Sequence, residues 1–257
     1  MIISFTTISS RVDIVDNVVF NILNQSIEEF ELRLYISKEP WLLDKGITSI
    51  PHRLEKLKKD SRFKVIYTKN TGPYRKLIPA LTEFWGTKKP IITIDDDVAY
   101  PNNFLETMTH AQKIFDCPIA FRGREITLNS QNKILPYKKW KSSNLAGASA
   151  CKLPTGKDGV IYMPHHFSRD VLNINHALEI AKTADDLWFK WHTLRAGYAS
   201  CLLLDALQDS FTSIENEEKS EITLYDTYNK KGGNDEIIEN LQSHYPLKKE
   251  LNEKFIY

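Results

Sequence analysis

The strongest chemical signal in the sequence is three consecutive carboxylates, Asp95, Asp96 and Asp97, directly after the apolar run Pro90 to Ile94. Adjacent carboxylates repel one another, and a divalent cation removes that cost. Hard oxygen ligands suit Mg²⁺ or Mn²⁺, which usually keep some waters and share substrate phosphates. Because side chains alternate along an extended segment, we expect Asp95 and Asp97 to point to one side and Asp96 to the other. The triplet therefore predicts a metal site with Asp97 as direct ligand and Asp95 as partner to metal or ribose. A solvated acidic turn is the alternative.

Two further segments could contribute to a site. The acidic pair Asp185-Asp186 opens a helical pattern, and helix capping alone would explain it, since acids near a helix N-terminus are stabilising. The segment from Gly156 to Gly159 carries glycines that permit positive φ and close backbone approach to a bound molecule. A simple turn before the next apolar run explains this segment equally well.

The elements that must position these residues alternate between strand and helix in the first hundred residues. Val15, Val18, Val19 and Ile22 recur at the spacing of an amphipathic helix. The expected strands are residues 2–5, 32–36, 63–68 and 90–94, and a second helix is expected at about 74–84. This alternation predicts right-handed βαβ units and a largely parallel sheet covered on both faces. Ligands of such sheets bind beyond the carboxyl ends of the strands, where the acidic triplet lies.

The pattern changes after a helix expected at about residues 103–115. Short β-like runs follow at 118–121, 125–128, 134–140 and 160–163, a strand at 198–204, and helices at about 171–181, 185–195 and 235–244. Because no repeat or low-complexity linker divides the chain, we expect a single α/β domain over residues 1–257.

Composition excludes several classes of protein. The chain has 257 residues with 34 basic and 33 acidic side chains, a formal charge of +1, which argues against a nucleic-acid-binding protein. The cysteines Cys117, Cys151 and Cys201 are widely spaced and predict neither a zinc ribbon nor a disulfide framework. The sequence shows no signal-peptide pattern and no apolar run of membrane-spanning length. We expect a cytoplasmic protein that at most contacts the inner face of the cell membrane.

Five segments in order resemble bacterial GT-A glycosyltransferases, in particular family-2-like enzymes of polysaccharide and lipooligosaccharide assembly. The segments are Ser4-Phe5-Thr6-Thr7 with Arg11, Gly72-Pro73-Tyr74-Arg75-Lys76-Leu77, Ile94-Asp95-Asp96-Asp97-Val98-Ala99-Tyr100-Pro101, Pro154-Thr155-Gly156-Lys157-Asp158-Gly159-Val160 and Thr183-Ala184-Asp185-Asp186-Leu187-Trp188. The resemblance covers about residues 2 to 190 and implies the GT-A fold. In this fold, a Rossmann-like nucleotide-binding sheet with helices on both faces (about residues 1–100) is fused to an acceptor-binding half (about 101–257).

The resemblance also implies a nucleotide-sugar donor, UDP-linked, with Mn²⁺ or Mg²⁺ as cofactor. Thr6, Thr7 and Arg11 would lie near the base and ribose. Lys76, expected at the start of a helix, would reach the phosphates, and a helix N-terminus itself favours an anion. An exposed lysine is the alternative for Lys76. The nucleotide-sugar would also contact Asp95, Asp96, Gly156 and Gly159.

A catalytic base is implied at the second acidic pair. In the family, one carboxylate of such a pair acts as base on the acceptor hydroxyl, an effect of about 10²- to 10⁴-fold. The family's second position maps to Asp186, and Asp185 stays open as the alternative. A base there implies an inverting, single-displacement transfer to a glycan or lipid-linked glycan. Trp140, amid Lys138, Lys139 and Lys141, and His165 are weaker candidates for acceptor contacts.

Three other functions were weighed. Sugar-phosphate nucleotidyltransferases usually carry a glycine-rich loop after the first strand, whereas Thr6 to Arg11 contains no glycine. Haloacid-dehalogenase-type phosphatases need Thr or Val two residues after the second aspartate, where this chain has Ala99. A non-catalytic nucleotide- or sugar-binding protein of the same fold would have little use for Asp185-Asp186.

Overall fold

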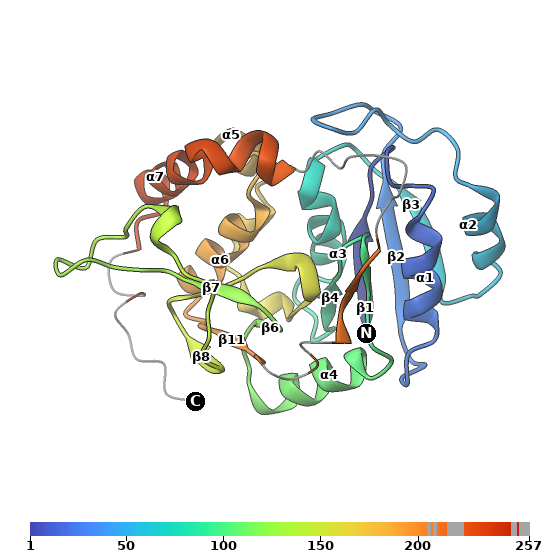
Figure 1. Ribbon diagram of the computed structural model, residues 1–257, viewed down its shortest axis with the longest axis horizontal. Helices are drawn as coiled ribbons and strands as arrows, with labels where there is room; N and C mark the ends of the chain where they lie inside the picture. Colours follow the sequence, from blue (N-terminus) through green and yellow to red (C-terminus); the bar gives the residue numbers. More distant parts are fainter. Residues whose placement is uncertain (205–206, 208–209, 215–223, 248–250, 252–257) are drawn as a thin grey trace.

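A mixed sheet of eight described strands forms the centre of the protein (Figure 1). The computed structural model describes all residues except 205–206, 208–209, 215–223, 248–250 and 252–257. The strand order is β3-β2-β1-β4-β10-β6-β11-β8. The bounds are β1 Ile2–Thr6, β2 Glu31–Ile36, β3 Phe63–Tyr67, β4 Ile91–Thr93, β6 Ile119–Ala120, β8 Gly147–Ser149, β10 Val160–Tyr162 and β11 Ser200–Leu202. Two small pairs lie outside this sheet: β5 (Val98–Ala99) with β12 (Thr212–Ser213), and β7 (Gly123–Glu125) with β9 (Lys152–Pro154).

The first four strands are parallel, as the βαβ alternation predicts. β1 pairs in parallel with β2 and β4, and β2 pairs in parallel with β3. β10 then runs antiparallel to both β4 and β6. The carboxyl ends of β1 and β4 therefore lie at one edge of the sheet, and the residues that follow β10 leave from the opposite edge.

Helices cover both faces of the sheet. Alternate strand residues enter different cores, as the period of two requires: Ile3 packs in the core under α1, α2 and α4, and Ile2 packs in the core under α3, α5, α6 and α7. The helices are α1 Val15–Leu23, α2 His52–Leu57, α3 Ile78–Glu83, α4 Phe104–Ile114, α5 Ile174–Ile180, α6 Asp185–Arg195 and α7 Asn234–His244. In Figure 1, α1 and α2 lie beside β1–β3, whereas α5, α6 and α7 gather at the other end of the sheet.

Short helical turns connect several of these elements. Four of the 3₁₀ turns are Gly72–Lys76, Tyr137–Lys139, Gly156–Asp158 and Pro164–His166, and a π-helical segment, Tyr225–Gly233, leads directly into α7. The single helix expected at 74–84 is therefore divided, because Leu77 adopts φ −126° and ψ −47° between the 3₁₀ turn and α3. Lys76 ends that turn and does not begin an α-helix. Residues 134–140 form a 3₁₀ turn and an isolated bridge, so the strand expected there is wrong.

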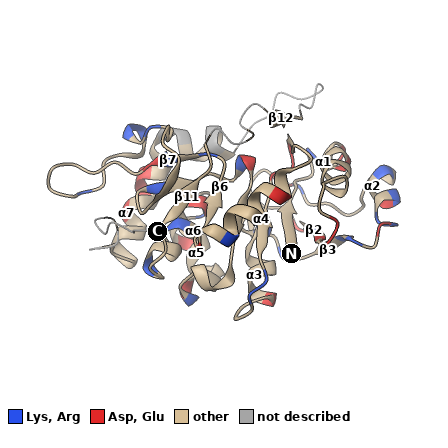
Figure 2. Cartoon of the chain, turned by 90° about the horizontal axis from the view of Figure 1, so that it is seen from below, with Lys and Arg blue, Asp and Glu red and all other residues tan. Residues whose placement is uncertain are grey.

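Figure 2 shows basic and acidic residues interspersed around the chain, with α2 carrying both signs. No helix among the described residues is long and apolar enough to cross a membrane.

Candidate active site

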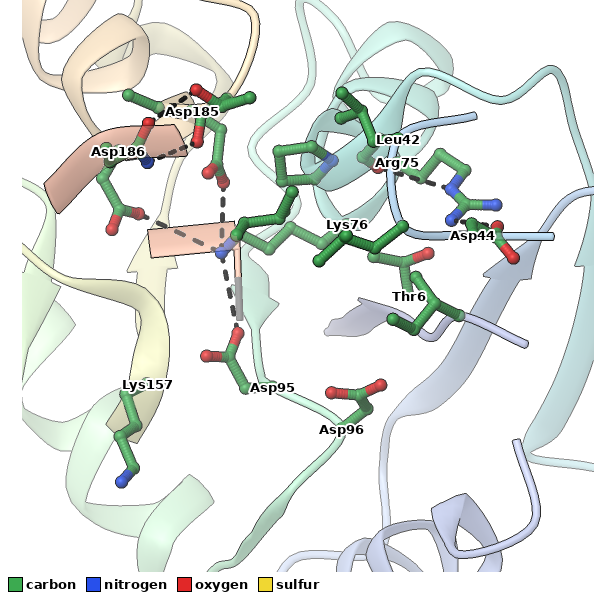
Figure 3. A pocket seen from close by; sticks show the side chains of 18 of the residues that line it. Thr6, Leu42, Asp44, Arg75, Lys76, Asp95, Asp96, Lys157, Asp185 and Asp186 are labelled. Carbon is green, nitrogen blue, oxygen red and sulfur yellow. Dashed lines mark hydrogen bonds and ion pairs between the residues drawn. The ribbon is translucent and has the colours of Figure 1, made fainter. Parts of the chain in front are cut away.

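A cavity of about 480 Å³ opens at the carboxyl ends of β1 and β4 (Figure 3). Both halves of the chain line it. The first half contributes Thr6, Thr7, Ile8, Arg11, residues 41–44, Gly72, Pro73, Arg75, Lys76 and residues 94–97. The second contributes Tyr137, Leu153, Lys157, residues 183–187, Leu224, Asn229 and Asn234. The two acidic segments predicted from the sequence therefore meet in one cavity.

The acidic triplet is held by specific partners. Asp96 is nearly buried, and its carboxylate accepts hydrogen bonds from Thr7 Oγ1 at 2.6 Å and Arg11 Nη1 at 2.8 Å. The same Arg11 nitrogen lies 3.6 Å from Asp97 Oδ2. Asp96 and Asp97 form a turn, so the extended geometry expected for all three residues is wrong. The assignment of Asp97 and Asp95 as metal ligands stays a prediction.

Lys76 joins the triplet to the second acidic pair. Its ammonium lies 3.1 Å from Asp185 Oδ2, 3.6 Å from Asp95 Oδ1 and 4.0 Å from Asp186 Oδ1. Burial by itself would lower the pKa of Lys76, but the attraction of Asp185, Asp95 and Asp186 outweighs it and holds the pKa well above the ordinary value. Lys76 is therefore a fixed positive charge at the centre of the cavity, as Figure 3 shows. The exposed-lysine alternative is wrong.

Asp186 lies in the first turn of α6 and faces the cavity. Its side chain is 29% exposed, and that exposed area borders the cavity. Burial inside the protein raises the pKa of Asp186 to about 7; the Lys76 ammonium opposes the shift, and the neighbouring Asp185 and Asp95 add to it. The backbone N–H of Gly156 donates to Asp186 Oδ2 at 3.3 Å. A carboxyl group with a pKa of about 7 changes its protonation near neutral pH.

The glycines of the segment from Gly156 to Gly159 lie against neighbouring side chains of the site and the core. A Cβ on Gly156 would lie 2.6 Å from Lys76 Nζ, so a larger residue there would displace the flexible end of the lysine from its present position. Gly159 adopts φ +90°, and a Cβ there would lie 2.6 Å from the ring of Phe104. Neither Gly156 nor Gly159 is among the residues that line the cavity, and the close approach of Phe104 by itself explains a glycine at position 159.

A buried ion pair that the sequence did not reveal forms the other end of the cavity. Arg75 Nη2 lies 3.0 Å from Asp44 Oδ2, and both side chains are almost fully buried. Asp44 also accepts hydrogen bonds from Asn70 Nδ2 at 3.1 Å and from the backbone N–H of Ser9 and Gly46 at 3.0 Å each. Arg75 Nη1 is buried and has no hydrogen-bond partner among the described residues. Arg75 could have been found within the segment that contains Lys76, whereas Asp44 follows β2 in an irregular loop and carries no local signal.

The two weaker acceptor candidates do not reach the cavity. Trp140 is 1% exposed and its indole N–H donates to the carbonyl of Leu135, so its ring face is not available to a sugar. Tyr137, from the same segment, lines the cavity instead. His165 lies after β10 at the opposite edge of the sheet, where its Nε2 is 2.8 Å from Asp116 Oδ1. Neither residue lines the cavity, and a sequence pattern could show neither the burial of Trp140 nor the direction of β10.

Comparison with known proteins rests on structure alone. No family model matches the sequence, and no curated protein matches it. The chain is similar to S. aureus TarS 1-349 in complex with UDP-GlcNAc, with 13% identity and a TM-score of 0.56 over 96% of this chain and 68% of that one. S. aureus TarS 1-349 without that ligand gives 16% identity and a TM-score of 0.49, over 79% of this chain and 58% of that one. A 4-diphosphocytidyl-2C-methyl-D-erythritol synthase gives 8% identity and a TM-score of 0.45 over 84% of this chain and 93% of that one.

The likeness to the UDP-GlcNAc complex of TarS shows the fold. The chain has the α/β architecture predicted from its sequence, a GT-A-like fold in which helices cover both faces of a mixed sheet. The expected fold class is confirmed.

Proposed function

We propose that this chain is a metal-dependent, inverting glycosyltransferase of bacterial surface polysaccharide synthesis. It would move a sugar from a UDP-linked donor to a glycan or glycolipid acceptor. The observation that carries the proposal is the meeting of Asp95, Asp185 and Asp186 around Lys76, within 4.0 Å of its ammonium, at the carboxyl edge of a GT-A-type sheet. TarS, the similar protein, was crystallised with UDP-GlcNAc. A lipid-linked acceptor would bring a cytoplasmic protein to the inner face of the cell membrane.

The donor would lie across the cavity from the Asp44–Arg75 ion pair to Lys76. Thr6, Thr7 and Arg11 come from the end of β1 and the loop after it, beside the triplet, where a ribose and diphosphate would pass. The triplet offers only carboxylate oxygens, and none of the described cavity-lining residues is a histidine or cysteine. This donor set fits a hard cation, Mn²⁺ or Mg²⁺. Held by Asp97 and Asp95, such an ion would neutralise charge developing on the departing diphosphate.

Asp186 is the base in this proposal. The acceptor hydroxyl oxygen would form a bond to the anomeric carbon while the bond from that carbon to the diphosphate breaks on the opposite side. The hydroxyl proton would pass to Asp186. A carboxylate whose pKa lies near the operating pH is suited to this transfer, and burial raises the pKa of Asp186 to about 7. Asp185, 3.1 Å from Lys76, serves instead to hold that ammonium in place.

A direct test is the release of UDP from UDP-GlcNAc and other UDP-sugars with Mn²⁺, measured with and without p-nitrophenyl glycosides as acceptors. Asp186→Asn should reduce transfer by about 10²-fold or more while UDP binding is kept. Asp170→Asn, a surface carboxylate paired with Arg195, is the matched control. Incorporation of nucleotide with release of pyrophosphate from UTP would show a nucleotidyltransferase instead. Full transfer by Asp186→Asn would remove the base from the proposal.

A further inference from the structure

The cavity has a wall that the donor assignment does not use. Several of the described lining residues come from the second half of the chain and have no part in the donor assignment. Leu224, Asn229 and Asn234 belong to the π-helical segment and its junctions, and Tyr137 lies beside the start of α7. In Figure 1, α7 lies over the end of the molecule that contains α5 and α6, away from β1–β3.

The start of α7 is fixed on two sides. Asp235 Oδ1 accepts a hydrogen bond from the backbone N–H of Tyr137 at 2.5 Å. Thr183 Oγ1 donates to Asn229 Oδ1 at 2.6 Å, and Asn229 Nδ2 donates to the carbonyl of Thr183 at 3.1 Å. Thr183 stands two residues before Asp185. These contacts hold the start of α7 beside the segment that carries the acidic pair.

Asn234 is the polar residue of this wall whose side-chain oxygen has no partner. The residue is 5% exposed, it lines the cavity, and its Oδ1 is buried without a hydrogen bond among the described residues. Its neighbours Asn229 and Asp235 are both satisfied. A buried amide oxygen without a partner destabilises a fold, and such groups are retained where a ligand supplies the missing partner. The terminal torsion of asparagine is broad, so the amide can turn its oxygen toward the cavity.

We propose that the Asn234 amide binds a hydroxyl group of the acceptor sugar. The inference rests on the proposed glycosyl transfer and assigns the acceptor side of that site. The predicted nucleotide contacts Thr6, Thr7 and Arg11 come from the first half of the chain, whereas Asp186, as the base, must contact the attacking hydroxyl of the acceptor. The acceptor therefore lies on the wall that carries Asp186, and the hydrogen bonds between Thr183 and Asn229 join the start of α7, with Asn234, to that wall. A buried, uncharged amide favours an acceptor that has a hydroxyl at this position, because an acceptor without that hydroxyl would leave the amide without a hydrogen bond.

The test compares three reactions of Asn234→Ala and Asn234→Leu with those of the wild type. These are binding of UDP with Mn²⁺, hydrolysis of UDP-GlcNAc to UDP by water alone, and acceleration of UDP release by a panel of p-nitrophenyl monosaccharides. We expect UDP affinity and hydrolysis to stay within about twofold and the acceptor kcat/KM to fall about tenfold or more, the size of one lost hydrogen bond. Asn240→Ala, on the same helix and outside the cavity lining, should leave all three unchanged. Asn234→Leu should melt no lower than the wild type, because it removes an unpaired buried amide.

Several results would overturn the inference. Equal loss of hydrolysis and transfer would place Asn234 at the donor, and retained acceptor kcat/KM would show that the amide is not used. If the wild-type protein binds UDP but no sugar of the panel accelerates its release of UDP from the donor, the sugar-hydroxyl site on this wall is contradicted. Failure of the proposed function itself looks different, because the wild type would then release no UDP from UDP-GlcNAc, either to water or to a sugar. If Asn234→Leu fails to fold, Asn234→Ala and Asn234→Asp carry the same comparison.

Discussion

Replacing Lys76 by methionine removes the positive charge around which the site is built while keeping the length of the side chain. The ammonium lies 4.0 Å from Asp186 Oδ1. At an effective dielectric constant of about 20, two unit charges at that distance interact by about 4 kcal/mol. Since one pKa unit corresponds to about 1.4 kcal/mol, losing Lys76 can raise the pKa of Asp186 by up to about three units. Screening by water in the cavity reduces this, so we expect a rise of about one to three units.

The wild-type pKa of about 7 would then move to between about 8 and 10. A base must be deprotonated to act, so kcat/KM at pH 7 should fall between about fivefold and five-hundredfold and recover as the pH rises. The assay is UDP release from the donor with an acceptor over pH 6 to about 10, with Lys88→Met as the exposed-lysine control. If activity in Lys76→Met still falls off below about pH 7, as in the wild type, the electrostatic reasoning is refuted. Equal loss of activity at every pH would refute it too.

Three further predictions concern neighbouring and distant parts of the fold. Gly156→Ala should displace the flexible Lys76 ammonium, because its Cβ would lie 2.6 Å from Nζ. The pKa of the acid limb of the kcat/KM profile should therefore rise, while UDP affinity stays within about twofold. An acid limb with an unchanged pKa would contradict this prediction. Trp140→Ala should lower the free energy of unfolding in urea by about 3–5 kcal/mol. If the variant loses glycosyl transfer while its stability is unchanged, Trp140 contacts the acceptor after all. Lys190, whose Nζ bonds Ser200 Oγ at 2.9 Å, has its pKa lowered by burial to about 7 from 10.5. The unfolded chain therefore binds more protons than the folded chain between those pH values, and the free energy of unfolding rises with pH there. Lys190→Met should raise Tm at pH 7 and reduce the dependence of stability on pH. A lower Tm would contradict this prediction.

Sequence periodicity predicted the parts of the fold that depend on local pattern. The amphipathic spacing of Val15, Val18, Val19 and Ile22 gave α1, and the helix predicted over residues 185–195 matches α6, Asp185–Arg195. The position of Asp95 after a buried parallel strand also followed from the pattern, because the carboxyl ends of such strands bind ligands.

The contacts within the site depend on tertiary structure and could not be predicted. Lys76 is more than a hundred residues from Asp185 in sequence, and only the folded sheet brings them to 3.1 Å. Asp44 lies in an irregular loop whose partner, Arg75, becomes recognisable only when both are buried. Trp140 and His165 had suitable chemistry, but burial and the direction of β10 remove both from the cavity. A pattern of residue types indicates which chemistry a chain can perform, and the packing decides which residues perform it.

The most direct test of the central claim is calorimetric titration of UDP, with GDP as the competing base, in the presence and absence of Mn²⁺. The wild type should bind UDP, more tightly with Mn²⁺. Asp97→Asn should lose the metal-dependent gain, whereas the surface control Asp170→Asn should keep it. No binding of either nucleotide under any condition would contradict the account and leave the acidic triplet as a structural turn held by Thr7 and Arg11.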